Sequence, residues 1–291
     1  MRTTLTSNFR PLLRAFFPFL IGIAALWAVS TNARAQLYVT QNIGIVSEYD
    51  AKTGAVINAN FIMGLNYPTG LAVSGNTLFV TNNISGTVGK YDATTGGAIN
   101  GGFITGLNGP CDVAVSDNTL FVSNNNSGTV GTYDPTTGAT INASFITGLS
   151  GQVGLAVKRN TLFVTSGNNT LGKYNATTGA AIKPRFIKGL KLPVGLRLAV
   201  SDNTLFVVGF RGTVSTYDAT TGAAINPTFI TNLYDPISVA LSDNKLFLLR
   251  DSGPSSSLKI GVYDADTGKV INPNLITGLG PPSDIAVKSA K

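Results

Sequence analysis

The sequence predicts an all-β protein, a six-bladed β-propeller of four-stranded antiparallel blades, and three observations support this fold. Only 12% of the residues are charged and 33 are glycine, which suits a compact chain with many turns. Each repeat contains four short apolar segments separated by turn residues, and a period near 42 residues with four strands is typical of a propeller blade. The period is marked by six tyrosines at intervals of 41 to 46 residues: Tyr49, Tyr91, Tyr133, Tyr174, Tyr217 and Tyr263.

The four strands of a blade can be assigned in residues 76–117 and the segments equivalent to them. Strands such as "DVAVSD" and "NTLFVT" meet at a two-residue turn in which Asn follows Asp, Gly or Arg. Asn, Asp and Gly tolerate the positive φ of a tight hairpin. A third strand, "GTVGKYD", and a fourth, "INGGFI", flank a turn that begins with Asp or Asn and ends with Gly. Apolar residues on both faces of "LFV" and "VAV" predict sheets buried between neighbouring blades, with Phe79, Phe103 and their equivalents as packing residues.

The phase of the repeat predicts how the ring closes. The mature chain opens with a strand of the second type, Leu37–Thr40, and ends with a strand of the first type, Asp284–Val287. The C-terminal strand should therefore complete the first blade, which leaves no unpaired inner edge.

Residues 1–35 form a predicted secretory signal peptide, and residues 36–291 form a single propeller domain. Three arginines precede an uncharged run, Ala15–Val29, and Ala33-Arg34-Ala35 is a small-residue cleavage signal. The alternative, a transmembrane anchor, needs about 20 apolar residues, and Pro18 interrupts this run. No second apolar stretch of that length occurs, so we expect an exported protein, periplasmic or extracellular, with no transmembrane segment after cleavage.

The composition argues against several classes of function. Cleavage removes four arginines and lowers the net charge from +7 to +3, which makes nucleic-acid binding unlikely for an exported chain. The chain has no histidine, and its lone cysteine, Cys111, can form no intramolecular disulfide. Because a reactive thiolate needs a base or cation beside it, we expect Cys111 to be a packing residue.

Two passages carry a resemblance to known repeats. "LYVTQNIGIVSEYDAKTGAVI" and "LFVTNNISGTVGKYDATTGGAI" resemble the YVTN-type propeller repeat, and the "VAVS…LFV" passages are similar to NHL-repeat propellers. The resemblance covers residues 36–291 and implies a propeller, which hosts many unrelated functions. Related lyases use a histidine base, which this chain lacks, and related lactonases hold a metal near the channel with Glu, Asn and Asp. The single glutamate here, Glu48, lies in a third strand, where we expect it to be solvated.

Residues that depart from the repeat gather in the loops around the predicted channel mouth. Aromatic and charged side chains at a loop-lined opening are typical of a site for a small polar ligand, a sugar or a peptide end. The alternative is that these residues vary without a functional role, because sequence varies freely in solvated loops. The candidate ligand-binding residues are Tyr67, Asp112, Arg197, Phe210, Arg211, Tyr234, Arg250, Asp251 and Asp284.

The fourth repeat is distinctly basic. Between Lys158 and Arg197 there are eight basic residues and no acidic ones. This blade could contact an acidic partner or surface, although spread-out charges also suit a merely soluble face.

These observations favour an exported, non-catalytic propeller that binds a protein, a glycan or a cell-surface ligand, or serves as a scaffold. The alternative is a metal-dependent lactonase- or lyase-like enzyme. We expect no cofactor and no catalytic residue, and the one cation to consider is Ca²⁺, held weakly by Asp112, Asp284 and Asn side chains.

Overall fold

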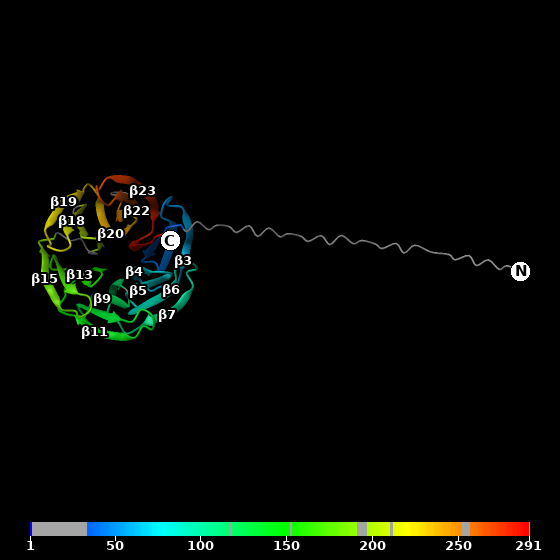
Figure 1. Ribbon diagram of the computed structural model, residues 1–291, viewed down its shortest axis with the longest axis horizontal. Coiled ribbons are helices and arrows are strands. Elements are labelled where there is room, and N and C mark those ends of the chain that lie inside the picture. Colours follow the sequence, from blue (N-terminus) through cyan, green and yellow to red (C-terminus); the bar gives the residue numbers. More distant parts are fainter. Residues whose placement is uncertain are drawn as a thin grey trace. The chain divides into compact units, whose positions relative to one another are not determined.

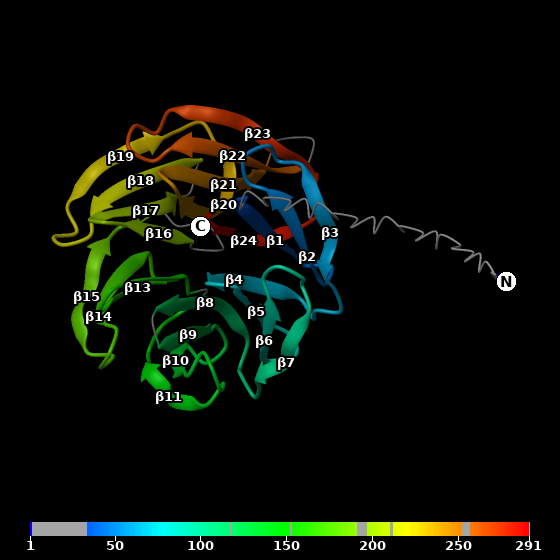
Figure 2. The ribbon, with the colours of Figure 1, turned by 45° about the vertical axis from the view of Figure 1, so that its right-hand side comes forward.

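The computed structural model describes Met1 and residues 34–116, 118–151, 153–190, 197–209, 212–251 and 257–290. Six four-stranded antiparallel sheets lie around a common axis within the compact unit Ala33–Lys291, as Figure 1 and Figure 2 show. The described residues contain no helix, so the predicted six-bladed propeller is confirmed. Apart from Met1, Arg34 and Ala35, the predicted signal peptide lies outside the described residues, and its cleavage stays a prediction. No helix that could cross a membrane was found among the described residues.

The innermost strands contact one another around the axis. In the order of blades 1 to 6 they are β24 (Pro282–Lys288), β4 (Pro68–Ser74), β8 (Pro110–Ser116), β12 (Leu155–Lys158), β16 (Leu198–Ser201) and β20 (Tyr234–Ser242).

The second and third strands form the middle of each blade and are mostly buried. The second strands are β1 (Gln36–Gln41), β5 (Thr77–Asn82), β9 (Thr119–Asn124), β13 (Thr161–Ser166), β17 (Thr204–Gly209) and β21 (Lys245–Asp251). The third strands are β2 (Ile45–Asp50), β6 (Thr87–Asp92), β10 (Thr129–Tyr133), β14 (Thr170–Asn175), β18 (Thr213–Asp218) and β22 (Leu258–Asp264).

The outermost strands begin with exposed residues and end with buried ones. They are β3 (Val56–Ile62), β7 (Ala98–Ile104), β11 (Thr140–Ile146), β15 (Ala181–Lys188), β19 (Ala224–Ile230) and β23 (Val270–Leu279). Each is joined to its third strand with a register shift, because the outer strand carries extra residues opposite the inner one.

The ring closes as the sequence predicts. Strand β24 pairs antiparallel with β1, with Ala286 opposite Tyr38 and Val287 opposite Leu37. Blade 1 therefore combines the two ends of the propeller chain in one sheet, β24-β1-β2-β3. Hydrogen bonds between the ends replace the free edge that an open ring would expose.

The predicted turns form as expected. In blade 2, Oδ1 of Asp92 accepts hydrogen bonds from the backbone N–H groups of Thr94 and Thr95, both at 2.8 Å. Gly96 closes the turn with φ of 72° and donates its N–H to the carbonyl of Asp92. These hydrogen bonds lower the pKa of the Asp92 carboxyl, because they stabilise its charged form.

The core lies between blades rather than within one. Tyr38 and Phe61 of blade 1, with ring centroids 5.4 Å apart, belong to one cluster with Leu78 and Val80 of blade 2. Five further clusters join the remaining neighbouring blades in the same way. Each sheet is thus covered on both faces, as the apolar "LFV" and "VAV" segments indicate.

Glu48 corrects one expectation from the sequence. It was expected to be solvated, but its residue is only 3% exposed. The side-chain amide of Gln36 donates a hydrogen bond to its carboxylate, and burial raises the pKa of Glu48. The reason is that a third strand is covered by a neighbouring blade on either face, so position in that strand does not imply contact with water.

Candidate functional site

Six equivalent positions, one from each innermost strand or the residue before it, surround the axis. The positions are equivalent by strand pairing. In each blade the residue that follows the position pairs with the third residue of the "LFV" segment of the second strand, or its equivalent, as Leu71 after Gly70 pairs with Val80. In the order of blades 1 to 6 these axial positions are Asp284, Gly70, Asp112, Gly154, Arg197 and Ser238. Three of the six are charged, which is unusual for the inner wall of a buried ring.

Arg197 crosses the axis to the opposite side of the ring. It precedes β16 of blade 5, and its Nη2 donates hydrogen bonds to the carbonyls of Thr69 in blade 2 and Cys111 in blade 3, the latter at 3.2 Å. Gly70 lies beneath this contact, where a Cβ atom would stand 2.8 Å from Cα of Asp112. The absence of a side chain at Gly70 therefore lets blades 2 and 3 approach closely where the guanidinium binds.

Two carboxylates flank the guanidinium and complete the axial cluster, Arg197, Asp112 and Asp284. Nη1 of Arg197 forms an ion pair with Oδ1 of Asp112 and lies 3.6 Å from Oδ2 of Asp284. Both acidic side chains are only 7% exposed. Because the three side chains come from blades 1, 3 and 5, the cluster joins alternate blades across the axis.

Every carboxylate oxygen of the cluster has a protein donor. Asp112 accepts hydrogen bonds from the N–H groups of Val113 at 2.9 Å and Leu155 at 2.8 Å. Asp284 accepts from the N–H of Leu71 at 2.9 Å and from the hydroxyl of Ser238 at 2.7 Å. Asp112 therefore accepts from blades 3 and 4, and Asp284 accepts from blades 2 and 6. Together with Arg197 of blade 5, groups from five of the six blades stabilise the two buried carboxylates.

Burial dominates the electrostatics of Asp284. Removal from water raises the pKa of its carboxyl to about 6, and the neighbouring Asp112 acts in the same direction. Arg197 and the two hydrogen bonds oppose this shift. Burial lowers the pKa of Arg197, but the charges of the two acids outweigh it and raise the pKa above its usual value, so the guanidinium stays charged.

The axial cluster does not fit the calcium site considered from the sequence. Asp112 and Asp284 would supply its carboxylates, but the cation between them is the Arg197 guanidinium. A calcium ion would have to displace this side chain and take oxygens already engaged by backbone N–H groups. Across the described residues, no group of three or more His, Cys, Asp or Glu side chains lies close enough to hold a metal ion.

The other candidate residues do not all join this cluster. Arg250 is 8% exposed, and its Nη2 donates to the carbonyl of Pro273 in the outermost strand of its own blade, at 3.1 Å. Tyr234 pairs with Asp251 at the start of β20 and is 56% exposed, and Tyr67 is 43% exposed. Phe210 and Arg211 lie outside the described residues. Ligand binding by these nine residues stays a prediction.

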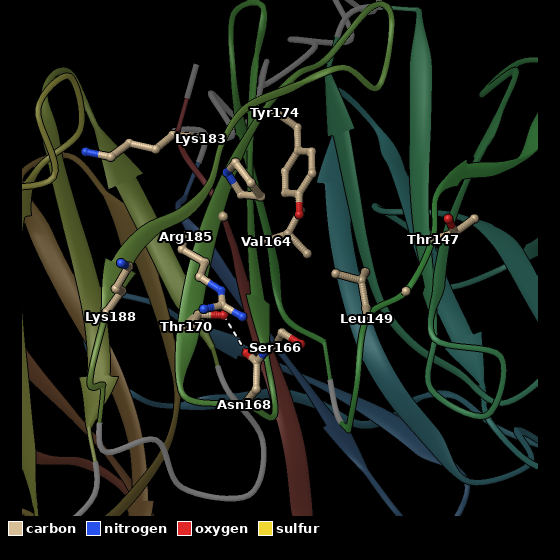
Figure 3. Close-up of a pocket in the computed structure, with 13 residues that line it drawn as sticks. Thr147, Leu149, Val164, Ser166, Asn168, Thr170, Tyr174, Lys183, Arg185 and Lys188 are labelled. Atoms are coloured by element: carbon tan, nitrogen blue, oxygen red, sulfur yellow. Dashed lines mark hydrogen bonds between the residues drawn. The ribbon is translucent and has the colours of Figure 1, made fainter.

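The basic fourth repeat lines a cleft of about 530 Å³ between blades 3 and 4. Residues 147–149, after β11, form one wall, and side chains of β13, β14 and β15 form the other, as Figure 3 shows. Leu149, Val164 and Tyr174 are its apolar part, while Arg185 and Lys188 bring positive charge. None of the described residues that line it is acidic.

Sequence reasoning named Asp112, Arg197 and Asp284 as candidates but did not predict that the three share one position of the repeat. The one-residue insertion before Leu198 hid the equivalence, which becomes evident when Leu198 is aligned with Leu155. The cleft was also missed, because the basic residues were counted over a whole repeat instead of compared position by position.

Comparisons with known proteins support the propeller architecture. The model of a family described as "Outer membrane protein assembly factor BamB" matches residues 126–276, which is just over half of the chain. A chain of the crystal structure of a nidogen/laminin complex has a TM-score of 0.67 at 13% identity, covering 88% of this chain and 99% of that one. The computationally designed protein Ika8 has a TM-score of 0.53 at 18% identity, covering 88% and 77%.

The structural similarities show the fold alone, because both identities are low. No curated protein matches the sequence significantly. The finer assignment to YVTN or NHL repeats stays a prediction.

Proposed function

The chain belongs to the family described as outer membrane protein assembly factor BamB, and from that premise we propose that it is an exported, non-catalytic propeller that binds a partner protein in the cell envelope. The family description names an assembly factor, so its activity is expected to be contact with other proteins. A rigid ring with two loop-lined faces suits a scaffold, because its loops can vary without loss of the core.

The axial cluster is the observation that carries this proposal. In the lactonases that this repeat resembles, the channel holds the metal on which the chemistry depends. Here the guanidinium of Arg197 lies between the carboxylates of Asp112 and Asp284, and the three residues join alternate blades. The charged residues at the axis therefore serve the ring itself, which leaves binding to the outer surfaces.

The loop face around the channel offers two side chains for such binding. Tyr67 and Tyr234 are about half exposed, and both precede or begin an innermost strand. Tyrosine is favoured at protein interfaces because it combines a large apolar ring with a polar hydroxyl. The loop backbone has a positive φ at both places, 56° at Tyr67 itself and 26° at Asp235, the residue after Tyr234. These angles define the local shape of each loop.

Site-specific photo-crosslinking tests the proposal. A photoreactive residue is placed at position 67 or 234 of the mature chain, residues 36–291, and the protein is exposed to an envelope extract. Position 136, in an exposed turn between a third and a fourth strand, is the control because such turns lie on the opposite face.

We expect discrete protein adducts at position 67 or 234 and none at position 136. The proposal is wrong if no protein adduct forms at either position, or if the purified chain hydrolyses lactones in a Ca²⁺-dependent manner.

A further inference from the structure

The outermost strand of blade 4 departs from the other five at three positions. Lys183, Arg185 and Lys188 replace residues that are neutral in every other blade. At the position of Lys183 the others have Asn58, Asn100, Asn142, Asn226 and Asn272. At the position of Arg185 they have Asn60, Gly102, Ser144, Thr228 and Asn274, and at that of Lys188 they have Met63, Thr105, Thr147, Thr231 and Thr277. Three cations on one strand of one blade indicate a local role.

The first of these replacements removes a repeated hydrogen bond. In the other five blades Oδ1 of the asparagine accepts the backbone N–H two residues later, at 3.0 to 3.1 Å. This bond satisfies the bulge of the outer strand. Lysine has no acceptor, so blade 4 gives up this bond to carry a positive charge.

The other basic residues of blade 4 in the described part of the chain are mostly engaged. Nζ of Lys158 lies 3.0 Å from Oδ1 of Asp202. Nζ of Lys173 donates to the carbonyls of Ala219 and Thr220 in blade 5. Arg185 and Lys188, by contrast, form no ion pair with any described residue.

Arg185 and Lys188 line the cleft between blades 3 and 4. Figure 3 shows Arg185 directed toward the end of the strand that carries Thr170, whereas Lys183 extends in another direction. Nζ of Lys183 lies 5.6 Å from the centre of the Phe186 ring, which places it beside Lys173, whose Nζ is 5.0 Å from the same ring. Lys183 also lines the cleft, but its ammonium group lies toward the Phe186 ring and adds to the positive field from there.

From this arrangement we propose that the cleft between blades 3 and 4 binds an acidic peptide segment of a partner protein. Arg185 and Lys188 would pair with two carboxylates of an extended segment, and the partly buried Leu149 would contact an apolar part of it. Arg185 and Lys188 belong to a strand with a register shift and both line the cleft, so one extended segment could contact both. This inference rests on the proposed binding function.

The cleft favours recognition of side chains over the addition of a strand. Pro184 lies at the centre of the basic segment and has no N–H group to donate to an added strand. A glycan is less well matched, because sugar rings usually stack on exposed aromatic faces. Among the described residues that line the cleft, Tyr174 is the one aromatic residue, and it is only 8% exposed.

A peptide-binding experiment with matched variants tests the inference. The probe is a fluorescent ten-residue peptide of alternating Glu and Ser, and the control peptide has Gln in place of Glu. The cleft variant is Arg185→Thr with Lys188→Thr, which installs the residues that blade 5 has at these positions. The charge-matched control is Lys52→Thr with Lys269→Thr, two exposed turn residues of blades 1 and 6.

We expect the cleft variant to bind the acidic peptide at least about tenfold more weakly than the parent, which corresponds to one lost charge-assisted contact. The control variant should bind within about twofold, since remote exposed charges are screened. The Gln peptide should not bind, and 1 M NaCl should abolish binding of the Glu peptide.

Three results would overturn the inference. They are equal weakening in both variants, equal binding of both peptides, or binding of polygalacturonate without binding of the acidic peptide. If the parent forms crosslinks with envelope proteins but the cleft variant binds the peptide as the parent does, this inference fails and the proposed function stands. If no partner is captured at all, the proposed function fails.

Discussion

Arg197 shows how one residue can determine the chemistry of a propeller axis. Its guanidinium brings a positive charge between two buried carboxylates, and its Nη2 binds two backbone carbonyls from other blades. A buried ion pair contributes little compared with apolar packing, but removal of one partner leaves an uncompensated charge. The cluster should therefore be sensitive to single substitutions.

Replacing Arg197 by methionine tests this dependence. Arg197→Met should lower the free energy of unfolding by about 3–5 kcal/mol, because Asp112 and Asp284 would face each other without a cation. Urea denaturation at pH 8 measures the loss, and it should be smaller at pH 5, where one acid can be protonated. Arg185→Met, at an exposed position, is the control and should change stability by less than about 0.5 kcal/mol. A loss below 1 kcal/mol at pH 8 would contradict the assigned role.

Asp284 should make stability depend on pH in an unusual direction. Its pKa in the folded chain is about 6, above the value of about 3.9 for an unfolded chain. The folded state therefore binds more protons between these values, so the contribution of Asp284 is fully present below about pH 4 and is lost as the pH rises through 6. The turn aspartates act oppositely, since their lowered pKa values cost stability as the pH falls below about 4.

Thermal unfolding between pH 4 and 7 can isolate this effect. The parent should lose stability from pH 5 to pH 7, and Asp284→Asn should flatten the profile in that interval. Asparagine can still accept from Leu71 and donate to Ser238, so the variant should fold. An unchanged slope in Asp284→Asn would show that another group titrates.

Among the strands, the outermost ones show how the ring limits pairing with strands of other molecules. Six exposed edges, each with an exposed aliphatic residue such as Ile99 or Ile225, could recruit other strands. Each edge instead carries a bulge, in five blades fixed by an asparagine, and three blades add a proline at its centre. Bulges and prolines both interrupt the ladder that a new strand would need.

Strand β15 should be less stable than its equivalents because it lacks the asparagine. Lys183→Asn should restore the hydrogen bond to the N–H of residue 185 and add about 0.5 kcal/mol, which corresponds to a rise in Tm of about 1–2 °C. The reciprocal control, Asn226→Lys in blade 5, removes the bond to Thr228 and should lower Tm by a similar amount. A Tm that falls in Lys183→Asn would show that the lysine stabilises the fold and is not there for binding.

At the scale of the whole molecule, stability depends on closure by β24. This strand supplies Ile285 and Ala286 to two different inter-blade clusters and Asp284 to the axis. Its loss would open the ring at one interface and expose the inner edge of β1. The sheets of the other five blades would keep all their strands, so unfolding should begin at blade 1 and spread to its neighbours.

Deletion of residues 282–291 tests the closure. The Tm should fall by at least about 10 °C, because several kcal/mol of packing and hydrogen bonding are lost and each costs about 2–4 °C. The truncated chain should also associate through β1, which size-exclusion chromatography can detect. Deletion of residues 290–291 alone, beyond β24, should change neither property. A truncated chain with the parent Tm would refute closure as a source of stability.

The number of blades, the four strands of each, the turns and the strand that closes the ring could all be predicted from the sequence. These follow from local rules that recur in every blade: short apolar segments, an Asp or Asn that caps its own turn, and glycine where φ is positive, as at Gly96. The burial of Glu48, by contrast, could not be predicted from the sequence, because a neighbouring blade covers its side chain.

The contacts of the residues that depart from the repeat could not be predicted without the folded ring. Asp112, Arg197 and Asp284 are 85 and 87 residues apart along the chain, yet their charges meet because the ring brings equivalent positions to one axis. Arg250 looks similar in the sequence but is directed to the outer strand of its own blade. Local propensity fixes where a residue lies in its blade, whereas the contacts of a long charged side chain depend on which blades the closed ring places around it.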